Sequence, residues 1–199
     1  MTQPVILGSA STVRHQLLIN AGVVHTVSSS RVDEDEIKLT CRNTGETVQA
    51  TARALAVAKA RTVSRKFGGA LVIGADQILT CDGAWFDKPA SEAAVHEHLV
   101  ALQGKTHHLV NATAIVENDV VVWEHGDTIE MVMRPLSPAF IADYLELVGD
   151  QARQSVGGYF LEGLGAQLFD RVEGDFFNIL GLPLLPLLAY LRVRNVLLS

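Results

Sequence analysis

The chain has 199 residues, of which 48% are hydrophobic and 19% are charged, and its formal net charge is -6. This length and composition suit one large α/β domain with a sizeable core and exclude a disordered chain. The negative net charge and the lack of a long basic run argue against a dedicated nucleic-acid binder, whereas a nucleotide ligand needs only a few well-placed cations.

The cysteines and the apolar segments indicate the cellular compartment that we expect for the protein. Cys41 and Cys81 lack CxxC or zinc-type spacing, so we expect two reduced thiols in a cytoplasmic protein. The N-terminus lacks the charged and apolar regions of a signal peptide. The most apolar segment, 179–191, is interrupted by a glycine and two prolines and is too short for a membrane span.

The start of the chain predicts an anion site. Residues 5–7 predict a strand, residues 8–11 form a small hydroxyl-rich loop, and the helix after them ends at Gly22 as a C-terminal cap. A loop at a helix N-terminus presents free N–H groups and the helix dipole to an anion, and Arg14 can reach back to the same anion. Alternatively, Ser11 is an ordinary N-cap and Arg14 is a solvated surface residue.

An acidic run follows a second expected strand at residues 23–29. Residues 33–36 are all acidic, which is typical of a solvated loop. One of these carboxylates can also help to hold a hard divalent cation such as Mg²⁺. Residues 39–46 are expected to form an irregular connection.

A long helix is predicted over residues 48–67. At about 100° per residue, its apolar face carries Lys59 together with Ala52, Leu55, Ala56 and Val63. A lysine in such a stripe can extend its charge to solvent, or it can face a cleft and meet an anion, and the pattern favours neither alternative.

The stretch 71–77 predicts a buried strand that ends at an acid. Its apolar run closes with two small residues, and Asp76 follows. A carboxylate in such a place is costly unless it is paired or binds a metal, although it can also simply cap or turn the strand. A second apolar run at 78–79 leads to Asp82 and Gly83, a hairpin-turn dipeptide.

The second half of the chain alternates between strands, helices and glycine-rich turns. Lys88 precedes Pro89, whose ring limits the loop, and the pattern alone favours an exposed loop lysine. No HExxH, GxSxG or Walker motif is present, so zinc-protease, serine-hydrolase and P-loop mechanisms lack support. The further expected elements are a helix at 91–102 capped by Ser91, strands at 108–116, 120–123 and 129–133, a helix from Ser137 to about residue 148, glycine-rich strands and turns at 157–175, and an apolar helix after residue 183.

Taken together, these segments resemble the Maf family of nucleoside triphosphate pyrophosphatases. The resemblance covers nearly the whole chain in the family's order, and the ordered series is more specific than any one motif. The matching stretches are residues 7–14 (family L-A-S-x-S-P-R-R), 32–34 (V-D-E), 55–60 (L-A-x-x-K-A), 73–76 (I-G-A-D), 88–89 (K-P), 104–107 (G-x-T-H), 133–137 (F-R-x-L-S), 162–166 and 181–184.

The resemblance implies a fold and a reaction. The fold is α/β and similar to inosine triphosphatase, a single domain over residues 1–199 whose twisted mixed sheet is flanked by helices, with two lobes around a cleft. The reaction is hydrolysis of a nucleoside triphosphate to the monophosphate and pyrophosphate, with a divalent metal cation (Mg²⁺, Mn²⁺ or Co²⁺). The family also suggests a homodimer, with neither a membrane nor a nucleic-acid polymer as partner.

The resemblance also assigns roles to individual residues. Asp76 is the proton acceptor or the metal-assisted activator of the attacking water. Glu34, or alternatively Asp33, binds the divalent metal together with Asp76. The residues that hold the triphosphate are Ser9, Arg14, Lys59 and Lys88.

Three positions choose the base in the family, and here they are Val13, Gln77 and Glu162. In the subgroup that resembles dTTP/UTP pyrophosphatases these positions are Arg, Thr and Gln, whereas the Gln and Glu of this chain resemble the 7-methyl-GTP subgroup. A glutamate accepts hydrogen bonds from the N1–H and N2–H₂ edge of guanine, which favours a purine. Val13 stands where that subgroup usually has an aromatic ring, and Glu162 is alternatively a structural acid in a turn.

Two departures from the family's opening motif leave room for a different function. Thr12 and Val13 replace its proline and its first arginine. This motivates the hypothesis of a non-catalytic nucleotide-binding regulator of cell division. A dTTP/UTP pyrophosphatase and a generic α/β phosphatase that releases orthophosphate are two more hypotheses.

Overall fold

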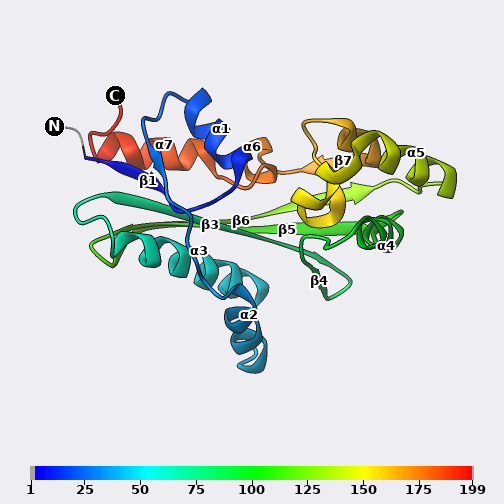
Figure 1. The fold of residues 1–199 in the computed structure, drawn as a ribbon, viewed down its shortest axis with the longest axis horizontal. Coiled ribbons are helices and arrows are strands. Elements are labelled where there is room, and N and C mark those ends of the chain that lie inside the picture. The colour runs from blue at the N-terminus through cyan, green and yellow to red at the C-terminus, as the bar shows by residue number, and fades with distance from the viewer. Residues whose placement is uncertain (1–2, 199) are drawn as a thin grey trace. The chain divides into compact units, whose positions relative to one another are not determined.

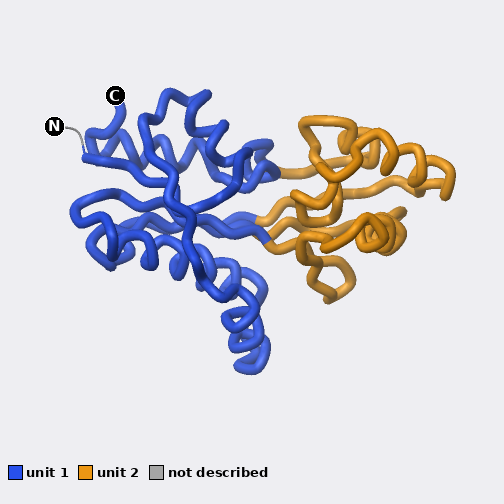
Figure 2. The backbone as a smooth tube through the Cα atoms, in the orientation of Figure 1, with its two compact units in different colours: residues 1–77, 111–127, 175–199 blue, residues 78–110, 128–174 orange. Residues whose placement is uncertain are grey.

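The contacts within the chain divide it into two compact units (Figure 2). The computed structural model describes residues 3–198. Unit 1 comprises Met1–Gln77, Asn111–Asp127 and Asp175–Ser199, and unit 2 comprises Ile78–Val110 and Thr128–Gly174. Three long strands have residues in both units: β3 (Leu71–Cys81), β5 (Thr106–Glu117) and β6 (Val120–Met133).

The remaining elements belong to one unit each. Those of unit 1 are β1 (Val5–Leu7), α1 (Thr12–Asn20), β2 (Thr26–Val27), α2 (Glu34–Asn43), α3 (Val48–Ser64), α6 (Phe176–Ile179) and α7 (Leu184–Val193). Those of unit 2 are β4 (Ala84–Phe86), α4 (Glu92–Leu102), α5 (Pro138–Val148), the 3₁₀ turns η1 (Gly149–Gln154), η2 (Val156–Gly158) and η3 (Leu164–Leu168), and β7 (Phe169–Glu173).

The strands form one mixed sheet. Their order is β2-β1-β3-β5-β6-β7, and β4 pairs with β3. β1 is parallel to β2 and β3, whereas β4 and β7 are antiparallel to β3 and β6. In unit 1, α1 and α7 lie on one face of the sheet and α3 lies on the other (Figure 1). The predicted α/β class with a mixed sheet flanked by helices is confirmed, while the expected cleft stays a prediction.

β3 sends alternate side chains to the two faces of the sheet in unit 1. Ile73 and Ala75 pack into the core with residues of α1 and α7, whereas Val72 packs against α3. By the same alternation, Asp76 points to the α3 face and Gln77 points to the opposite face. Asp76 and Gln77 are neighbours in the strand, but their side chains therefore lie on opposite faces of the sheet.

The prediction that the buried strand ends at Asp76 is wrong. β3 continues without a break to Cys81, while its pairing with β1 ends at Ile73, opposite Leu7. The second apolar run is buried and carries the strand on into unit 2. Two small residues and one paired carboxylate do not interrupt a strand that is apolar on both sides of them.

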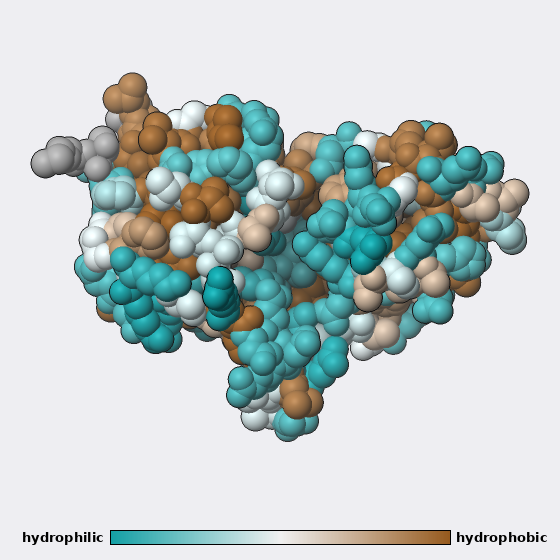
Figure 3. Space-filling model, viewed as in Figure 1, coloured by the Kyte–Doolittle hydropathy of each residue, from teal (hydrophilic) through white to brown (hydrophobic). Residues whose placement is uncertain are grey.

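The acidic run begins a helix, so the predicted loop at 33–36 and the irregular connection at 39–46 are wrong as far as Asn43. Asp33 caps α2 by accepting a hydrogen bond from the backbone N–H of Glu36 at 3.0 Å. Three carboxylates in the first turn stabilise the helix through its dipole. α2 buries no residue, and the surface over it is largely hydrophilic (Figure 3). Its sequence therefore resembles that of a solvated loop.

Two further expectations need correction. The strand expected at 23–29 is limited to Thr26–Val27. The separate strands expected at 120–123 and 129–133 form the single strand β6, because the polar residues between them stay extended with side chains that remain partly exposed. The strands and turns expected at 157–175 are present, as the 3₁₀ turns η2 and η3 and the strand β7.

The predicted hairpin turn and the predicted helix caps lie where the sequence places them. Asp82 and Gly83 have φ values of 50° and 81° and form the turn between β3 and β4. Ser91 caps α4 and Ser137 caps α5, and each side chain accepts a backbone N–H of the first turn. Within residues 3–198, no helix is both long and apolar enough to cross a membrane.

His107 is a fully buried titratable group of unit 2. Its Nε2 lies 2.7 Å from the hydroxyl oxygen of Tyr159, and its ring centroid lies 5.7 Å from that of Phe169. Burial lowers the pKa of His107 from its ordinary value of 6.5 to about 4, and the neighbouring charge of His108 adds to the shift. The folded unit therefore holds this histidine neutral.

We expect the stability of the protein to rise with pH between about 4 and 6.5 because of His107. In this window the unfolded chain binds a proton that the folded chain excludes, so acidification lowers the free energy of unfolding, by about 3 kcal/mol in all. Unfolding midpoints measured from about pH 7 to about pH 4.5 report the slope. His107→Gln should flatten it, and His96→Gln, at an exposed position of α4, should not. Equal slopes in the wild type and in His107→Gln contradict the assignment.

Candidate functional site

The predicted anion loop and Arg14 come together after β1. Ser9 is buried, and its Oγ accepts hydrogen bonds from the backbone N–H of Ser11 at 3.2 Å and from Nη1 of Arg14 at 3.3 Å. Ser11 is also the N-cap of α1, because its side chain accepts the backbone N–H of Arg14 at 3.3 Å. The loop thus gathers hydroxyls, a helix N-terminus and a guanidinium, which are groups that bind phosphate oxygens.

The guanidinium of Arg14 is held by backbone carbonyls and is not a solvated surface group. Nη1 donates to the carbonyl oxygen of Ala75 at 2.8 Å, and Nε donates to that of Gly181 at 2.8 Å. Burial lowers the pKa of Arg14, and the charges of Asp76 and Glu34 oppose that shift. The contact with Ala75 joins the anion loop to β3 just beyond the residues that pair with β1.

Lys59 meets two carboxylates, and we call Lys59, Asp76 and Glu34 the charged cluster. The Nζ atom of Lys59 lies 2.6 Å from Oδ1 of Asp76 and 2.9 Å from Oε1 of Glu34. The side chain of Asp76 is 7% exposed and that of Glu34 is 44% exposed. The cluster therefore extends from the sheet to the surface, and Lys59 pairs with acids of the protein instead of extending its charge to solvent.

Gly74 lets α3 approach β3 closely enough for this pairing. A Cβ atom at residue 74 would lie 2.2 Å from the carbonyl oxygen of Ala56 and 2.8 Å from the backbone nitrogen of Ala60. Gly74 and Asp76 point to the same face of β3. The close approach at the glycine therefore also brings Lys59, on the same turn of α3, to Asp76.

Glu34, and not Asp33, lies at the charged cluster. The carboxylate of Asp33 caps α2, whereas that of Glu34 contacts Lys59. Carboxylate oxygens are the ligands that Mg²⁺ prefers, and this ion is commonly held by one or two carboxylates together with substrate phosphates. Glu34 and Asp76 fit such a cation. Among residues 3–198 there is no group of three or more His, Cys, Asp or Glu suited to a metal, so water and substrate would complete its coordination.

One family model covers almost the whole chain: residues 4–194 match the model described as Maf-like protein. The chain belongs to the Maf-like protein family. It is 47% identical over 192 residues to a 7-methyl-GTP pyrophosphatase of Rhizobium johnstonii, with 96% of each chain covered. It is 48% identical over 195 residues to a nucleoside triphosphate pyrophosphatase of Nitrobacter hamburgensis, with 98% of this chain and 96% of the relative covered.

In this Maf-like chain the other predicted site residues lie in different places. Val13 is a partly buried residue of α1. Lys88 and Glu162 are exposed residues of unit 2, Lys88 between β4 and α4 and Glu162 shortly before η3. Their roles stay predictions. The predicted residues that the structure brings together in unit 1 are Ser9, Arg14, Glu34, Lys59 and Asp76.

Two buried asparagines that were not expected at the site accept hydrogen bonds from Gln77 in unit 1, Asn111 through its side chain and Asn178 through its backbone carbonyl. Asn111 of β5 and Asn178 of α6 are 1% and 3% exposed. The sequence does carry a signal for Asn111, because an amide inside a strongly apolar strand must find partners when it is buried. Asn178 follows two phenylalanines in a four-residue helix, and nothing in its local sequence indicates burial or a contact with β3.

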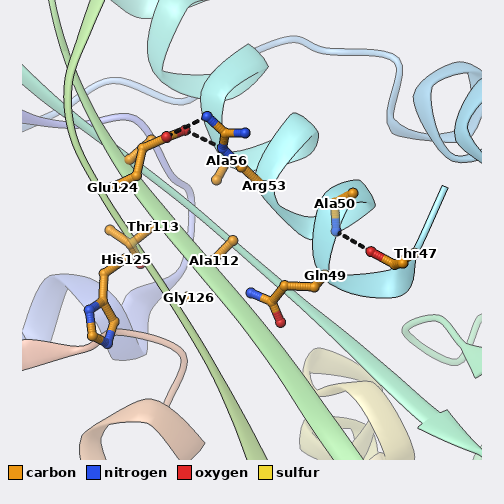
Figure 4. A pocket seen from close by; sticks show the side chains of 11 residues that line it. Thr47, Gln49, Ala50, Arg53, Ala56, Ala112, Thr113, Glu124, His125 and Gly126 are labelled. Atoms are coloured by element: carbon orange, nitrogen blue, oxygen red, sulfur yellow. Dashed lines mark hydrogen bonds and ion pairs between the residues drawn. The ribbon is translucent and has the colours of Figure 1, made fainter.

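A pocket of about 470 Å³ lies beside α3 in unit 1 of the Maf-like fold (Figure 4). Arg53 of α3 and Glu124 of β6 form an ion pair at its lining, with 2.6 Å between Nη2 and Oε2. The full lining is Thr47, Gln49, Ala50, Arg53, Ala56, Ala112, Thr113, Ala114, Glu124, His125 and Gly126. It includes no member of the charged cluster, so the pocket is separate from the candidate site.

Proposed function

We propose that this chain is a nucleoside triphosphate pyrophosphatase that releases pyrophosphate and the nucleoside monophosphate, with residues 1–199 as one catalytic domain. The observation that carries the proposal is the charged cluster, in which a buried Asp76 is held by Lys59 close to an anion loop. The relatives that match the chain nearly end to end are named for this reaction, which supports an enzyme over a non-catalytic regulator.

The proposed binding of the triphosphate uses cations and hydrogen-bond donors. Arg14 and Lys59 neutralise phosphate charge, and on the family resemblance we propose Lys88 as a further phosphate-binding residue. The Oγ atom of Ser9 already accepts two hydrogen bonds, so its own O–H is available to donate to a phosphate oxygen. Such contacts matter because cleavage of phosphate anhydrides depends mainly on positioning and charge neutralisation.

In the proposed chemical step, Asp76 accepts a proton from the attacking water. The water oxygen forms a bond to the α-phosphorus, the bond from that phosphorus to the bridging oxygen breaks, and pyrophosphate leaves with the bonding electrons. Glu34 and Asp76 would hold Mg²⁺, Mn²⁺ or Co²⁺, which when bound neutralises charge on the phosphates. Arg14 and Lys59 stabilise the same developing charge.

We further propose a purine substrate, ordinary or modified as in 7-methyl-GTP. Gln77 and Glu162 support this because they resemble the 7-methyl-GTP subgroup, and one relative at 47% identity carries that name. Val13 offers no ring on which a methylated base could stack. The alternative is a dTTP/UTP pyrophosphatase. A direct comparison of the substrates distinguishes the two assignments.

A substrate panel tests the reaction and the base. With 7-methyl-GTP, GTP, dTTP, UTP and CTP, we expect pyrophosphate and not orthophosphate, and we expect EDTA to abolish the release and excess Mg²⁺ or Mn²⁺ to restore it. Glu34→Gln should raise the metal concentration for half-maximal rate by about tenfold or more. Release of orthophosphate, or binding without turnover in every metal, contradicts the proposal. A preference for dTTP or UTP overturns the purine assignment.

Location and assembly are proposed on the family resemblance and on cysteine usage. Cys41 and Cys81 are both free thiols, which agrees with the reducing cytoplasm that we propose. We also propose a homodimer. Light scattering of the purified protein distinguishes a dimer from a monomer by mass.

A further inference from the structure

The side-chain amide nitrogen of Gln77 donates hydrogen bonds to acceptors of the protein. Nε2 donates to Oδ1 of Asn111 at 3.0 Å, to the backbone carbonyl oxygen of Ile179 at 3.1 Å and to that of Asn178 at 3.3 Å. A primary amide nitrogen carries two hydrogens. These acceptors therefore engage both of them.

The orientation of each amide in this network follows from acceptors that cannot donate. Backbone carbonyl oxygens face Gln77, so its nitrogen and not its oxygen must lie there. Nδ2 of Asn111 donates to the carbonyl oxygen of Asn178 at 3.0 Å, which turns Oδ1 of Asn111 toward Gln77. Nδ2 of Asn178 donates to a carboxylate oxygen of Asp127 at 3.0 Å. Flipping any of the three amides would set two oxygens against each other.

The network lowers stability in one respect. Asn111 and Asn178 are almost fully buried, and within residues 3–198 the Oδ1 atom of Asn178 has no hydrogen-bond partner. A buried polar atom without a partner costs about 1–3 kcal/mol, which an apolar side chain would avoid. Orientation of Gln77 explains the buried amide of Asn111 better than packing does, because Oδ1 of Asn111 accepts a hydrogen bond from Nε2 of Gln77.

Gln77 and Arg14 are held by the same short segment of unit 1. Ile179 accepts a hydrogen bond from Gln77, and two residues later the carbonyl oxygen of Gly181 accepts one from Arg14. Arg14 also binds the carbonyl oxygen of Ala75, two residues before Gln77 on β3. Segment 179–181 thus couples the proposed phosphate-binding arginine to the amide of Gln77.

We propose that Gln77 is a fixed hydrogen-bond acceptor toward the base, and that Asn111 positions it through its side chain while Asn178 and Ile179 position it through their backbone carbonyls. This inference rests on the proposed binding of a nucleotide. Because both N–H groups of Gln77 are engaged, its amide offers only Oε1. It therefore favours a base with an exocyclic amino group over a base that has hydrogen or a carbonyl oxygen in the same place.

Matched nucleotide pairs test this inference. GTP differs from ITP by one amino group, and CTP differs from UTP by an amino group in place of a carbonyl. We expect kcat/KM to favour the amino member of at least one pair by about tenfold. Gln77→Met, which keeps the length but removes the amide, should bring that ratio close to one. Asn111→Leu should lower it several-fold, because one N–H of Gln77 then loses its acceptor and is available to a carbonyl oxygen of the competing base.

The control is Thr113→Val. Thr113 is a buried polar residue of the same strand as Asn111, and its Oγ1 has no hydrogen-bond partner within residues 3–198. Its replacement keeps the shape, so the nucleotide ratios should stay at the wild-type values. A ratio in Gln77→Met equal to that of the wild type overturns the proposal.

An NMR measurement tests the orientation without turnover. In the free protein, the side-chain NH₂ signal that Gln77→Met removes should exchange with solvent at least about tenfold more slowly than that of the exposed Gln167. Asn111→Leu should reduce this protection, because Gln77 loses one of its acceptors, and fast exchange in the wild type overturns the proposal. Failure of the proposed function has a different signature: no triphosphate yields pyrophosphate, while the amide stays protected and dissociation constants for GTP and ITP still differ.

Discussion

Asp76→Asn is expected to reduce the rate of pyrophosphate release by about 10²- to 10⁴-fold. The substitution keeps the shape of the side chain and removes the carboxylate that we propose as proton acceptor and metal ligand. The fold should survive, because Glu34 remains within 2.9 Å of the Lys59 ammonium. Steady-state rates at saturating nucleotide, with an unfolding midpoint measured alongside, separate loss of chemistry from loss of structure.

Asp33→Asn is the matched control for this experiment. It makes the same chemical change beside Glu34, but at the N-cap of α2, where asparagine is as favourable as aspartate. Its rate should stay within about twofold of the wild type. Undiminished turnover in Asp76→Asn, or an equal loss in Asp33→Asn, removes Asp76 from the proposed role. Recovery of the Asp76→Asn rate in excess Mg²⁺ would indicate that the carboxylate acts mainly as a metal ligand.

Gly74→Ala is expected to destabilise the protein by about 1–3 kcal/mol or more. The added methyl would lie 2.2 Å from a backbone carbonyl oxygen of α3 and 2.9 Å from the Cβ of Ala60, so the helix must move away from β3. This movement would separate Lys59 from Asp76. We therefore expect the catalytic rate to fall together with stability, since a displacement of about 1 Å in an active site can cost about 100-fold.

The control for Gly74→Ala is Gly68→Ala. Its Cβ would have no heavy atom within 4 Å, and its φ does not lie in the left-handed region. Its stability should stay within about 0.5 kcal/mol of the wild type. Thermal or denaturant unfolding measures both variants, and each 1 kcal/mol lowers the unfolding midpoint by about 2–4 °C for a chain of this size. Equal midpoints for the two variants would show that close packing at Gly74 does not hold α3 in place.

Local chemistry made much of the fold predictable. Ser91 and Ser137 precede helices that they cap, and Asp82-Gly83 forms the expected turn, because these residues act on backbone groups a few positions away. The strand and helix periods likewise predicted β3 and α3. α2 was missed because it starts in an acidic run that is equally typical of a solvated loop, and because it buries no residue.

The sequence by itself determined which residue types could bind phosphate and a divalent cation, and the ordered motifs indicated the family. Only the tertiary structure decided their partners. It paired Lys59 with Asp76, placed the carboxylate of Glu34 and not that of Asp33 beside Lys59, and set Asn111 and Asn178 beside Gln77. These contacts join residues 17 to 101 positions apart. Such contacts depend on how a helix and a strand approach each other, as at Gly74, and no local pattern encodes that distance.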